Sequence, residues 1–402
     1  MPYVENEIIH DADAHIVELP DCLDDYIEPR LKDAYHAARN AEPEYAARML
    51  GREALIREKL SAKHADPEFR AGAAENLMSR KGHESLGGFL AEDRPQALDL
   101  LGFATQLMFT SIALRNFNLD TGDDMDLCYG AARAHNRMIT DFCSVDRRML
   151  PVAYIPIADM ERAPEEARFA LELGAKGFMI PQQPPKTHSP SHTGLDPLWA
   201  IAQEAGVPIL FHINGTDLNP SYRENGKPNV VIVSGDGDSN SLGYMSIPQP
   251  VQTTLAALIF DGVMDRFENL KFGAIELGAS WVPSWLRLMD NSFEAFARHE
   301  ERLRNLSARP SEIARRQVRV TPFPTDDVSW IIQNSAEEIC MFSSDYPHVE
   351  GGRNPLKRFR ENLVGSSLSQ RAIDGFFRDN YIDMMGKALP EDLRYPKHLV
   401  AA

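Results

Sequence analysis

Carboxylate and imidazole side chains occur at four points of this sequence, each at the end of a short apolar run. They are Asp13, His15, His212, Glu276, Asp345 and His348. Carboxylate oxygens and imidazole nitrogens together suit zinc, iron or manganese. Burying carboxylates without a cation would be costly, so the set predicts a site for a divalent transition metal. Taken singly, such a histidine more often packs in a core, and such an acidic residue more often caps a helix.

The elements that must position these residues are apolar runs that alternate with amphipathic stretches. The runs predicted as strands cover residues 8–16, 104–110, 150–157, 175–180, 207–213, 270–277, 318–321 and 339–343. The stretches predicted as helices cover residues 123–145, 160–173, 198–205, 253–260, 281–306 and 326–334. Apolar runs this continuous indicate a parallel sheet that is buried on both faces. Eight of them favour a closed α/β barrel, the (β/α)8 TIM barrel, over an open sheet.

The candidate ligands are expected at one end of this barrel. Asp13 and His15 share a face of the first strand, because side chains alternate along a strand. The other candidates follow strands five, six and eight. Because TIM barrels carry their active sites at the carboxyl ends of the strands, the sequence predicts one cluster at the barrel mouth.

Two segments are predicted to lie outside the barrel itself. Residues 19–101 have charged helical faces and little strand character, which indicates a helical insertion after the first strand. Residues 214–249 are rich in Gly, Asn, Asp and Ser, as in long loops that form lids or linkers. We expect residues 1–402 to form a single domain with this insertion.

Composition excludes several classes of protein. The hydrophobic share of 43% and charged share of 25% are ordinary for a globular protein, and a net charge of −17 argues against a nucleic-acid surface. No stretch approaches the ~18 apolar residues of a membrane span, and no secretory signal is visible. Cys22, Cys128, Cys143 and Cys340 are widely spaced and are predicted to be reduced core thiols. The sequence therefore predicts a cytoplasmic enzyme that forms a homo- or hetero-oligomer and binds a small-molecule substrate, but neither nucleic acid nor membrane.

Three segments resemble blocks of the amidohydrolase superfamily, in particular its amidohydrolase-related family of aromatic-acid decarboxylases and carbon–carbon hydrolases. They are DADAHIVE, LKFGAIELGASWVPSWL and FSSDYPHVEGG. With the strand order, the resemblance spans roughly residues 8–385, the insertion excepted. It implies a metal-dependent (β/α)8 barrel whose ligands are Asp13, His15, His212 and Asp345.

The sequence departs from the family pattern at two strand ends. Strand six carries Glu276, where the decarboxylases and many hydrolases have a histidine. Strand four ends in Met179-Ile180-Pro181, without the Lys or Glu that bridges two metals in binuclear hydrolases. Glu276 and the SSDYPH block resemble instead a small branch of dinuclear non-haem oxygenases. That resemblance implies an iron or manganese–iron pair, with Glu276 and His348 as ligands of a second metal.

The reaction expected from this resemblance is O2-dependent hydroxylation of a small organic acid or ester, by a monooxygenase supplied by an electron donor. Glu276 and Asp345 are then its catalytic residues. The alternative is a hydrolase or a non-oxidative decarboxylase of a carboxylated aromatic, with zinc or manganese. A third alternative is a non-catalytic barrel subunit of a hetero-oligomer. Strand six discriminates between the oxygenase and the hydrolase or decarboxylase. An anionic Glu276 stabilises a ferric pair, and it repels a substrate carboxylate. A carboxylate can, however, also serve as the general base of a hydrolase or decarboxylase.

Five further residues are candidates, each with a structural alternative. Glu18 is a candidate metal ligand or supporting residue, or else a surface residue. Arg115 and Asn116 follow strand two, where a guanidinium can bind a substrate carboxylate bidentately or form a surface salt bridge. Tyr222 and Arg223 lie in the loop after strand five and are expected to contact substrate if that loop closes.

Overall fold

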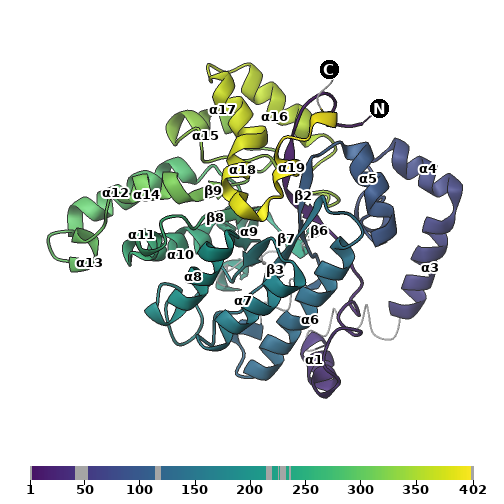
Figure 1. The fold of residues 1–402 in the computed structure, drawn as a ribbon, viewed down its shortest axis with the longest axis horizontal. Coiled ribbons are helices and arrows are strands. Elements are labelled where there is room, and N and C mark those ends of the chain that lie inside the picture. Colours follow the sequence, from purple (N-terminus) through teal and green to yellow (C-terminus); the bar gives the residue numbers. More distant parts are fainter. Residues whose placement is uncertain are drawn as a thin grey trace.

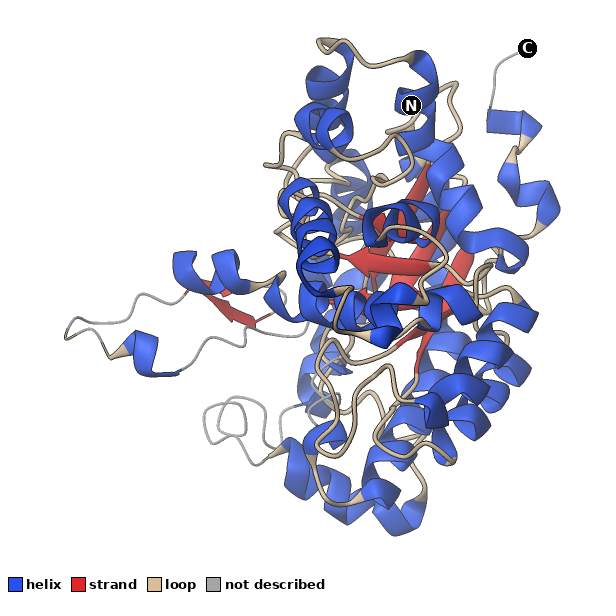
Figure 2. Cartoon of the chain, turned by 90° about the vertical axis from the view of Figure 1, so that its left-hand side faces the viewer, coloured by secondary structure: helices blue, strands red, loops and turns tan. Residues whose placement is uncertain are grey.

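Seven parallel strands form one curled sheet at the centre of the molecule, in the order β1-β2-β3-β4-β5-β8-β9 (Figures 1 and 2). The computed structural model describes residues 2–40, 53–113, 119–213, 220–224, 226, 232–234 and 237–399. The strands are β1 (His10–His15), β2 (Thr105–Phe109), β3 (Met149–Tyr154), β4 (Gly177–Met179), β5 (Ile209–His212), β8 (Phe272–Ile275) and β9 (Val318–Val320). Every residue of these strands is buried, as expected for a parallel sheet covered on both faces. The predicted α/β barrel class is confirmed.

The eighth position of the barrel is held by residues 339–346, which lie between β9 and β1. The Met341 amide donates to the Val320 carbonyl oxygen at 2.9 Å, and the His15 amide donates to the Tyr346 carbonyl oxygen at 2.7 Å. This segment therefore closes the ring, but it forms isolated bridges rather than the regular strand predicted for residues 339–343.

The ladder of this segment is interrupted because two of its amides are used elsewhere, and one of them, the Ser344 amide, donates to Oδ1 of Asp11 at 2.7 Å. The Phe342 amide donates to the Phe376 carbonyl oxygen, 2.8 Å away, in the C-terminal part of the chain. The apolar run alone predicts a strand, but it does not reveal that a C-terminal helix competes for this amide.

Helices surround the sheet and cover its outer face (Figure 1). Those after β2 are α6 (Met125–Cys143), α7 (Arg162–Leu173), α8 (Asp196–Ala205), α10 (Gln249–Phe260), α11 (Val263–Arg266), α12 (Val282–Phe296), α13 (Glu301–Arg304), α14 (Pro310–Gln317) and α15 (Val328–Asn334). The C-terminal ones are α16 (Pro355–Val364), α17 (Gln370–Asp374), α18 (Asn380–Met385) and α19 (Glu391–Arg394).

Two helical predictions after β8 need correction. The single helix predicted for residues 281–306 is two helices, α12 and α13, and no glycine or proline marks the break between them. Helix α14 was not predicted, although Pro310 opens its first turn and Glu312 accepts the amide of Arg309 at 3.0 Å. Proline in the first turn and this capping contact are both ordinary helix-start signals.

The insertion between β1 and β2 is helical, as predicted, with α1 (Lys32–Arg39), α3 (Glu53–Ala65), α4 (Pro67–Glu75) and α5 (Arg94–Leu101). Arg94, which is fully buried, joins it to the barrel. The Arg94 guanidinium donates to the carbonyl oxygens of His15 and Gly87, each at 3.0 Å, and to Gln106 Oε1 at 2.8 Å. Insertion and first strand are thus connected directly behind a candidate ligand.

The described part of residues 214–249 contains a hairpin and two short helical segments. The hairpin pairs β6 (Ile232–Ser234) with β7 (Gly237–Ser239), and Figure 2 shows it projecting away from the barrel. Segment η6 (Pro220–Arg223) precedes the hairpin, and α9 (Ser241–Ser246) follows it.

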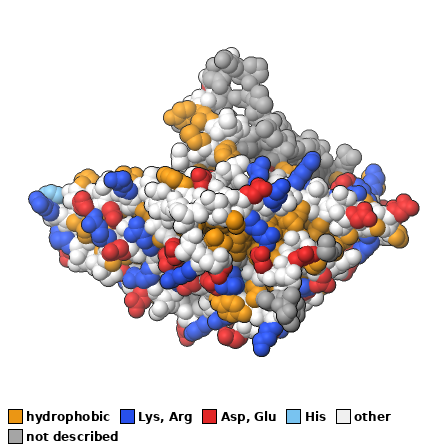
Figure 3. Space-filling model, turned by 90° about the horizontal axis from the view of Figure 1, so that it is seen from above, with side chains coloured by type: hydrophobic (Ala, Val, Ile, Leu, Met, Phe, Trp, Pro, Cys, Tyr) orange, Lys and Arg blue, Asp and Glu red, His pale blue; other side chains and the backbone are white. Residues whose placement is uncertain are grey.

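On the face seen in Figure 3, Lys and Arg side chains alternate with Asp and Glu side chains among the described residues. None of the described helices combines the length and the hydropathy needed to cross a bilayer. The four cysteines form no disulfide, and three of them are buried, whereas Cys22 is partly exposed.

Candidate metal centre

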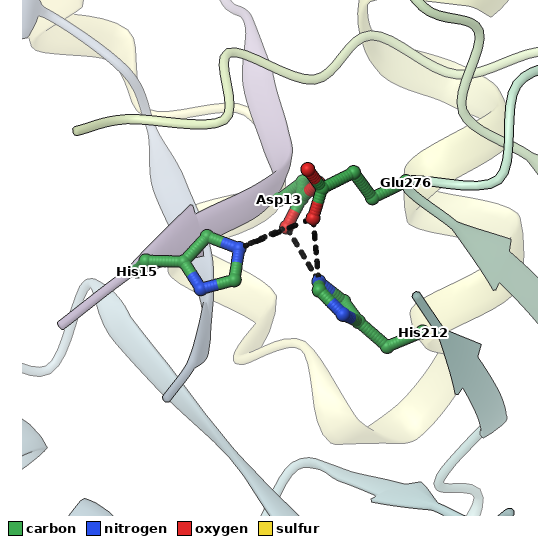
Figure 4. Close-up of side chains that lie close together, drawn as sticks. All are labelled: Asp13, His15, His212 and Glu276. Carbon is green, nitrogen blue, oxygen red and sulfur yellow. Dashed lines mark hydrogen bonds and ion pairs between the residues drawn. The ribbon is translucent and has the colours of Figure 1, made fainter. Parts of the chain in front are cut away.

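Four of the predicted ligands point toward one another at the carboxyl ends of β1, β5 and β8 (Figure 4). Nε2 of His15 lies 3.2 Å from Oδ1 of Asp13. Nε2 of His212 lies 3.4 Å from the same Asp13 oxygen and 3.3 Å from Oε2 of Glu276. All four residues are buried, with at most 5% of their surface exposed. Three strands that are far apart in the sequence thus bring two carboxylates and two imidazoles to one point.

Asp345 and His348 extend the cluster on the side of His15. Oδ1 of Asp345 lies 3.6 Å from Nε2 of His15 and 3.1 Å from Nδ1 of His348. The rings of His15 and His348 have their centroids 3.9 Å apart. The structure therefore brings all six predicted ligands into one buried group.

These six residues form two overlapping sets of ligand atoms. One set is Asp13, His15, His212 and Glu276, and the other is His15, Glu276, Asp345 and His348. Within each set, one ligand atom per residue lies within 4.8 Å of every other. Each set has the size of a four-coordinate metal site, and His15 and Glu276 belong to both.

The hydrogen bonds of His15 and His212 show which nitrogen of each ring faces the cluster. Their Nδ1 atoms lie 3.0 Å and 3.2 Å from the carbonyl oxygens of Thr110 and Ile213. A carbonyl oxygen only accepts, so Nδ1 of each ring donates to it, and Nε2 is the nitrogen directed at the cluster, where it can bind a metal in place of a hydrogen. Nε2 of His15 and Oδ2 of Asp13 are buried and make no hydrogen bond within the described part of the chain. A cation between them would satisfy both atoms, so the residues present fit a metal ion.

Asp13 is held as an anion, which is the form that binds metals. Burial alone raises the pKa of Asp13, but in the metal-free protein hydrogen bonds from the protonated rings of His15 and His212, and their positive charge, outweigh burial and lower the pKa to about 2. Metal ligands must be deprotonated, so this carboxylate is ready for coordination over the whole neutral range.

Two of the candidate ligands adopt a backbone conformation that non-glycine residues seldom take. Glu276 has φ 55° and Asp345 has φ 50°. The Glu276 amide donates to Oγ1 of Thr321 at 2.8 Å, and the Asp345 amide donates to the Asp13 carbonyl oxygen at 2.9 Å. Such residues cost about 1–3 kcal/mol each and concentrate at functional sites.

Asp11 supports the cluster through the residue next to Asp345, a role that the sequence did not predict. It is fully buried and accepts the backbone amide and the hydroxyl of Ser344, at 2.7 Å and 2.6 Å, and the side-chain amide of Gln106 at 2.7 Å. Asp11 thereby fixes the residue that precedes Asp345. Its spacing of two residues from Asp13 was the signal available in the sequence.

The remaining sequence candidates lie elsewhere or outside the described residues. The Glu18 carboxylate belongs to neither ligand set, and accepts the amides of Ser111 and Ala113 at 3.1 Å and 2.6 Å. Tyr222 is 65% exposed on η6, and no contact joins it to the centre within the described residues. Arg115, Asn116 and the side chain of Arg223 lie outside the described residues.

Two charged residues near Asp345 had no sequence signal. Nζ of Lys81, from the insertion, and both carboxylate oxygens of Glu350 are buried and have no hydrogen-bond partner within the described residues. Burial lowers the pKa of Lys81, against the opposing effect of Asp345 and Glu350. Glu350 also lines a cavity of about 20 Å³ beside Asp13 and Glu276, which has room for one water molecule.

Comparisons with known proteins agree with this fold. The family model described as Amidohydrolase matches residues 107–383. An amidohydrolase from Mycobacterium avium subsp. paratuberculosis has a similar solved structure, with a TM-score of 0.70 and 21% identity over 95% of this chain and 100% of that chain. No curated protein sequence gives a significant match.

Two decarboxylases also have similar solved structures. The 5-carboxyvanillate decarboxylase of Novosphingobium aromaticivorans, solved with manganese and a nitrobenzoic acid, has a TM-score of 0.61 and 17% identity over 96% of this chain and 99% of that chain. The dihydroxybenzoic acid decarboxylase of a Polaromonas species, solved with manganese and 2-nitroresorcinol, has a TM-score of 0.58 and 14% identity over 96% and 99%.

Proposed function

Because this chain belongs to the amidohydrolase family, we propose that its buried cluster holds two divalent transition-metal ions and that the enzyme hydroxylates a small organic acid or ester with O2. The observation that carries this proposal is the overlap of the two ligand sets at His15 and Glu276. Six candidate ligands exceed what one four-coordinate ion takes, whereas two ions that share only the Glu276 carboxylate would use all six, because the single Nε2 lone pair of His15 can bind just one of them.

The ligands suit an iron or manganese–iron pair. Three of the six are carboxylates, Asp13, Glu276 and Asp345, and anionic ligands stabilise the more oxidised states of such a pair. When bound, the pair would activate O2, so that one oxygen atom enters a C–H bond of the substrate and the other leaves as water. The balance requires two electrons and two protons from an external donor.

The chain itself supplies ligand placement and exclusion of water. His15 and His212 are held by backbone carbonyl oxygens, and Glu276 and Asp345 are held by their own backbone amides. A cavity lined by Glu276 and Glu350 lies beside the cluster, and its volume of about 20 Å³ has room for a single water molecule.

Non-oxidative decarboxylation of a carboxylated aromatic, at a site with manganese or zinc, is the second candidate. Two decarboxylases solved with manganese share the fold and favour it. Glu276 weighs against it, because this buried anion would repel a substrate carboxylate. Hydrolysis by the same centre would need a base, and a carboxylate with a tuned pKa can supply one.

Metal analysis and O2 uptake test the first candidate against the second. For protein from iron-supplemented cells we expect close to two ions per chain, with iron as at least one of them, and O2 consumption that depends on added ascorbate. The Asp345→Asn variant should lose about one ion, whereas Asp374→Asn, on the distant α17, should keep both. One manganese or zinc per chain, no ascorbate-dependent O2 uptake and release of CO2 from carboxylated aromatics would replace the first candidate by the second.

A further inference from the structure

The hydroxyl of Ser111 contacts a ligand of the second set. Ser111 follows β2 by two residues and is 8% exposed. Its Oγ lies 2.6 Å from Nε2 of His348 and 2.7 Å from the carbonyl oxygen of Ile16. In each of the three clustered histidines, one ring nitrogen points away from the cluster. In His348 this nitrogen contacts a side-chain hydroxyl, whereas in His15 and His212 it contacts a backbone carbonyl oxygen.

These contacts determine where the hydrogens lie. The Ile16 carbonyl oxygen can only accept, so it takes the single hydroxyl hydrogen of Ser111. Oγ of Ser111 then presents only lone pairs to His348, and Nε2 of His348 must carry the ring hydrogen. A neutral ring then has its lone pair on Nδ1, the nitrogen that faces Asp345 at 3.1 Å, and this is the form that a metal ion between the two residues would bind.

Ser111 is itself held from behind by a buried carboxylate. The Ser111 amide lies 3.1 Å from each carboxylate oxygen of Glu18, which also accepts the Ala113 amide at 2.6 Å. Glu18, Ser111 and His348 thus form a connected series of hydrogen bonds that ends at the second ligand set. This gives Glu18 a supporting place behind the centre, although its carboxylate belongs to neither ligand set.

We propose that Ser111 is the positioning residue of the second metal ion, acting by keeping His348 in the form that presents Nδ1. The inference rests on the proposed two-ion centre. Without the hydroxyl, His348 can rotate or move its hydrogen to Nδ1, and the second set loses a ligand. The first set does not include His348, so its affinity should not change.

Manganese titration of the metal-free protein by equilibrium dialysis measures both sites. In Ser111→Ala we expect a loss of about 10–100-fold in affinity for the second ion only, as for other residues that orient a metal ligand. Ser111→Thr should restore the affinity, because it restores the hydroxyl. Ser311→Ala is the matched control, since Ser311 is a buried serine with a side-chain hydrogen bond to Asp290, away from the cluster.

A second measurement needs no metal. Long-range proton–nitrogen NMR of the metal-free wild-type protein should show the hydrogen of the neutral His348 ring on Nε2. In Ser111→Ala it should show this hydrogen on Nδ1, or the two tautomers in exchange. If the alanine variant does not fold, Ser111→Cys replaces it, because sulfur accepts hydrogen bonds only weakly.

The outcomes separate this inference from the proposed function. A wild-type protein that binds a single ion contradicts the two-ion centre itself. A wild-type protein that binds two ions, with Ser111→Ala binding both as tightly and keeping the wild-type NMR pattern, overturns the role of Ser111 alone.

Discussion

Glu276 and Asp345 show how single residues of this centre depart from ordinary backbone geometry. Both have a positive φ, which in the described chain only Asn6 shares among residues other than glycine. In each case the amide has a fixed acceptor, Thr321 Oγ1 or the Asp13 carbonyl oxygen. The surrounding hydrogen bonds therefore compensate for an unfavourable conformation and direct a carboxylate into the cluster.

Thr321→Val tests this support at Glu276. Valine keeps the shape of threonine but cannot accept the Glu276 amide, which would stay buried and unsatisfied. We expect a loss of about 1–3 kcal/mol in the free energy of unfolding and a drop of about tenfold in metal affinity. Urea unfolding and metal titration measure the two effects. Unchanged metal affinity would mean that packing alone positions Glu276.

The ligand types were predictable from the sequence, but their support was not. Asp13, His15 and His212 end recognisable strands, so their convergence followed from the barrel alone. The positions of Lys81 and Ser111 in the sequence do not indicate a role in the centre, because they reach it through contacts between segments that are remote in sequence. The hydroxyl of Ser111, for example, meets a histidine 237 positions away.

At the scale of elements, the insertion does more than cover the barrel. Its Gly82 amide donates to the Pro347 carbonyl oxygen at 3.0 Å, and the hydroxyl of Tyr346 donates to its Leu86 carbonyl oxygen at 2.6 Å. These contacts hold residues 81–88 against the segment that carries Asp345. Lys81 thus arrives beside the centre as part of the insertion.

Lys81→Met should separate the stability of the insertion from its function. The pKa of Lys81 is lowered because the loss of hydration on burial destabilises its ammonium more than the negative charges of Asp345 and Glu350 stabilise it. Replacing the ammonium with an apolar chain of similar length is therefore expected to raise the free energy of unfolding by about 1–3 kcal/mol. Loss of turnover in this more stable variant would assign Lys81 to substrate or to the charge balance of the centre.

The matched control is Lys357→Met on α16, where the lysine is 67% exposed and no such gain is expected. Urea unfolding of both variants in the metal-free state measures the effect. A destabilised Lys81→Met protein would instead show that Lys81 is a structural partner of Asp345 and Glu350.

The strands were more predictable than the segments between them. Continuous apolar runs reveal a strand buried on both faces, so all seven regular strands fall within their predicted ranges or within one residue of them. Helix α14 and the β6–β7 hairpin were missed, because short elements depend on capping contacts and turns that hydrophobic periodicity does not register.

At the scale of the whole molecule, one buried apolar cluster reaches from Val4 to Leu393. A second cluster, which includes Leu23 and Met138, packs the insertion against α6. We propose on this basis that the chain unfolds as a single domain, and coincident unfolding transitions followed by fluorescence and circular dichroism would test it.

Acid should destabilise the whole fold through two buried histidines outside the metal centre. Burial lowers the pKa of His10 and of His135 to about 4. Between pH 6.5 and pH 4 these two histidines bind protons in the unfolded chain but not in the native protein. The free energy of unfolding therefore falls as the pH falls. The loss is up to about 3 kcal/mol for each histidine.

Urea unfolding at pH 7 and at pH 4.5 measures this loss. His135→Gln should reduce the difference between the two pH values by up to half, whereas His299→Gln, in the turn between α12 and α13, should leave it unchanged. An equal difference in all three proteins would assign the acid sensitivity to other groups.

The closure of the barrel by residues 339–346 has a consequence for the order of events at the ribosome. β1 is made long before its neighbour on one side, which includes the serine that Asp11 binds 333 positions later in the chain. At about 5–20 residues per second, β1 waits roughly 15–65 seconds for that neighbour. During this interval Asp13 and His15 have no Asp345 or His348 beside them. Metal loading of the complete centre therefore follows synthesis of residues 339–348, and the nascent protein must protect an open strand edge until then.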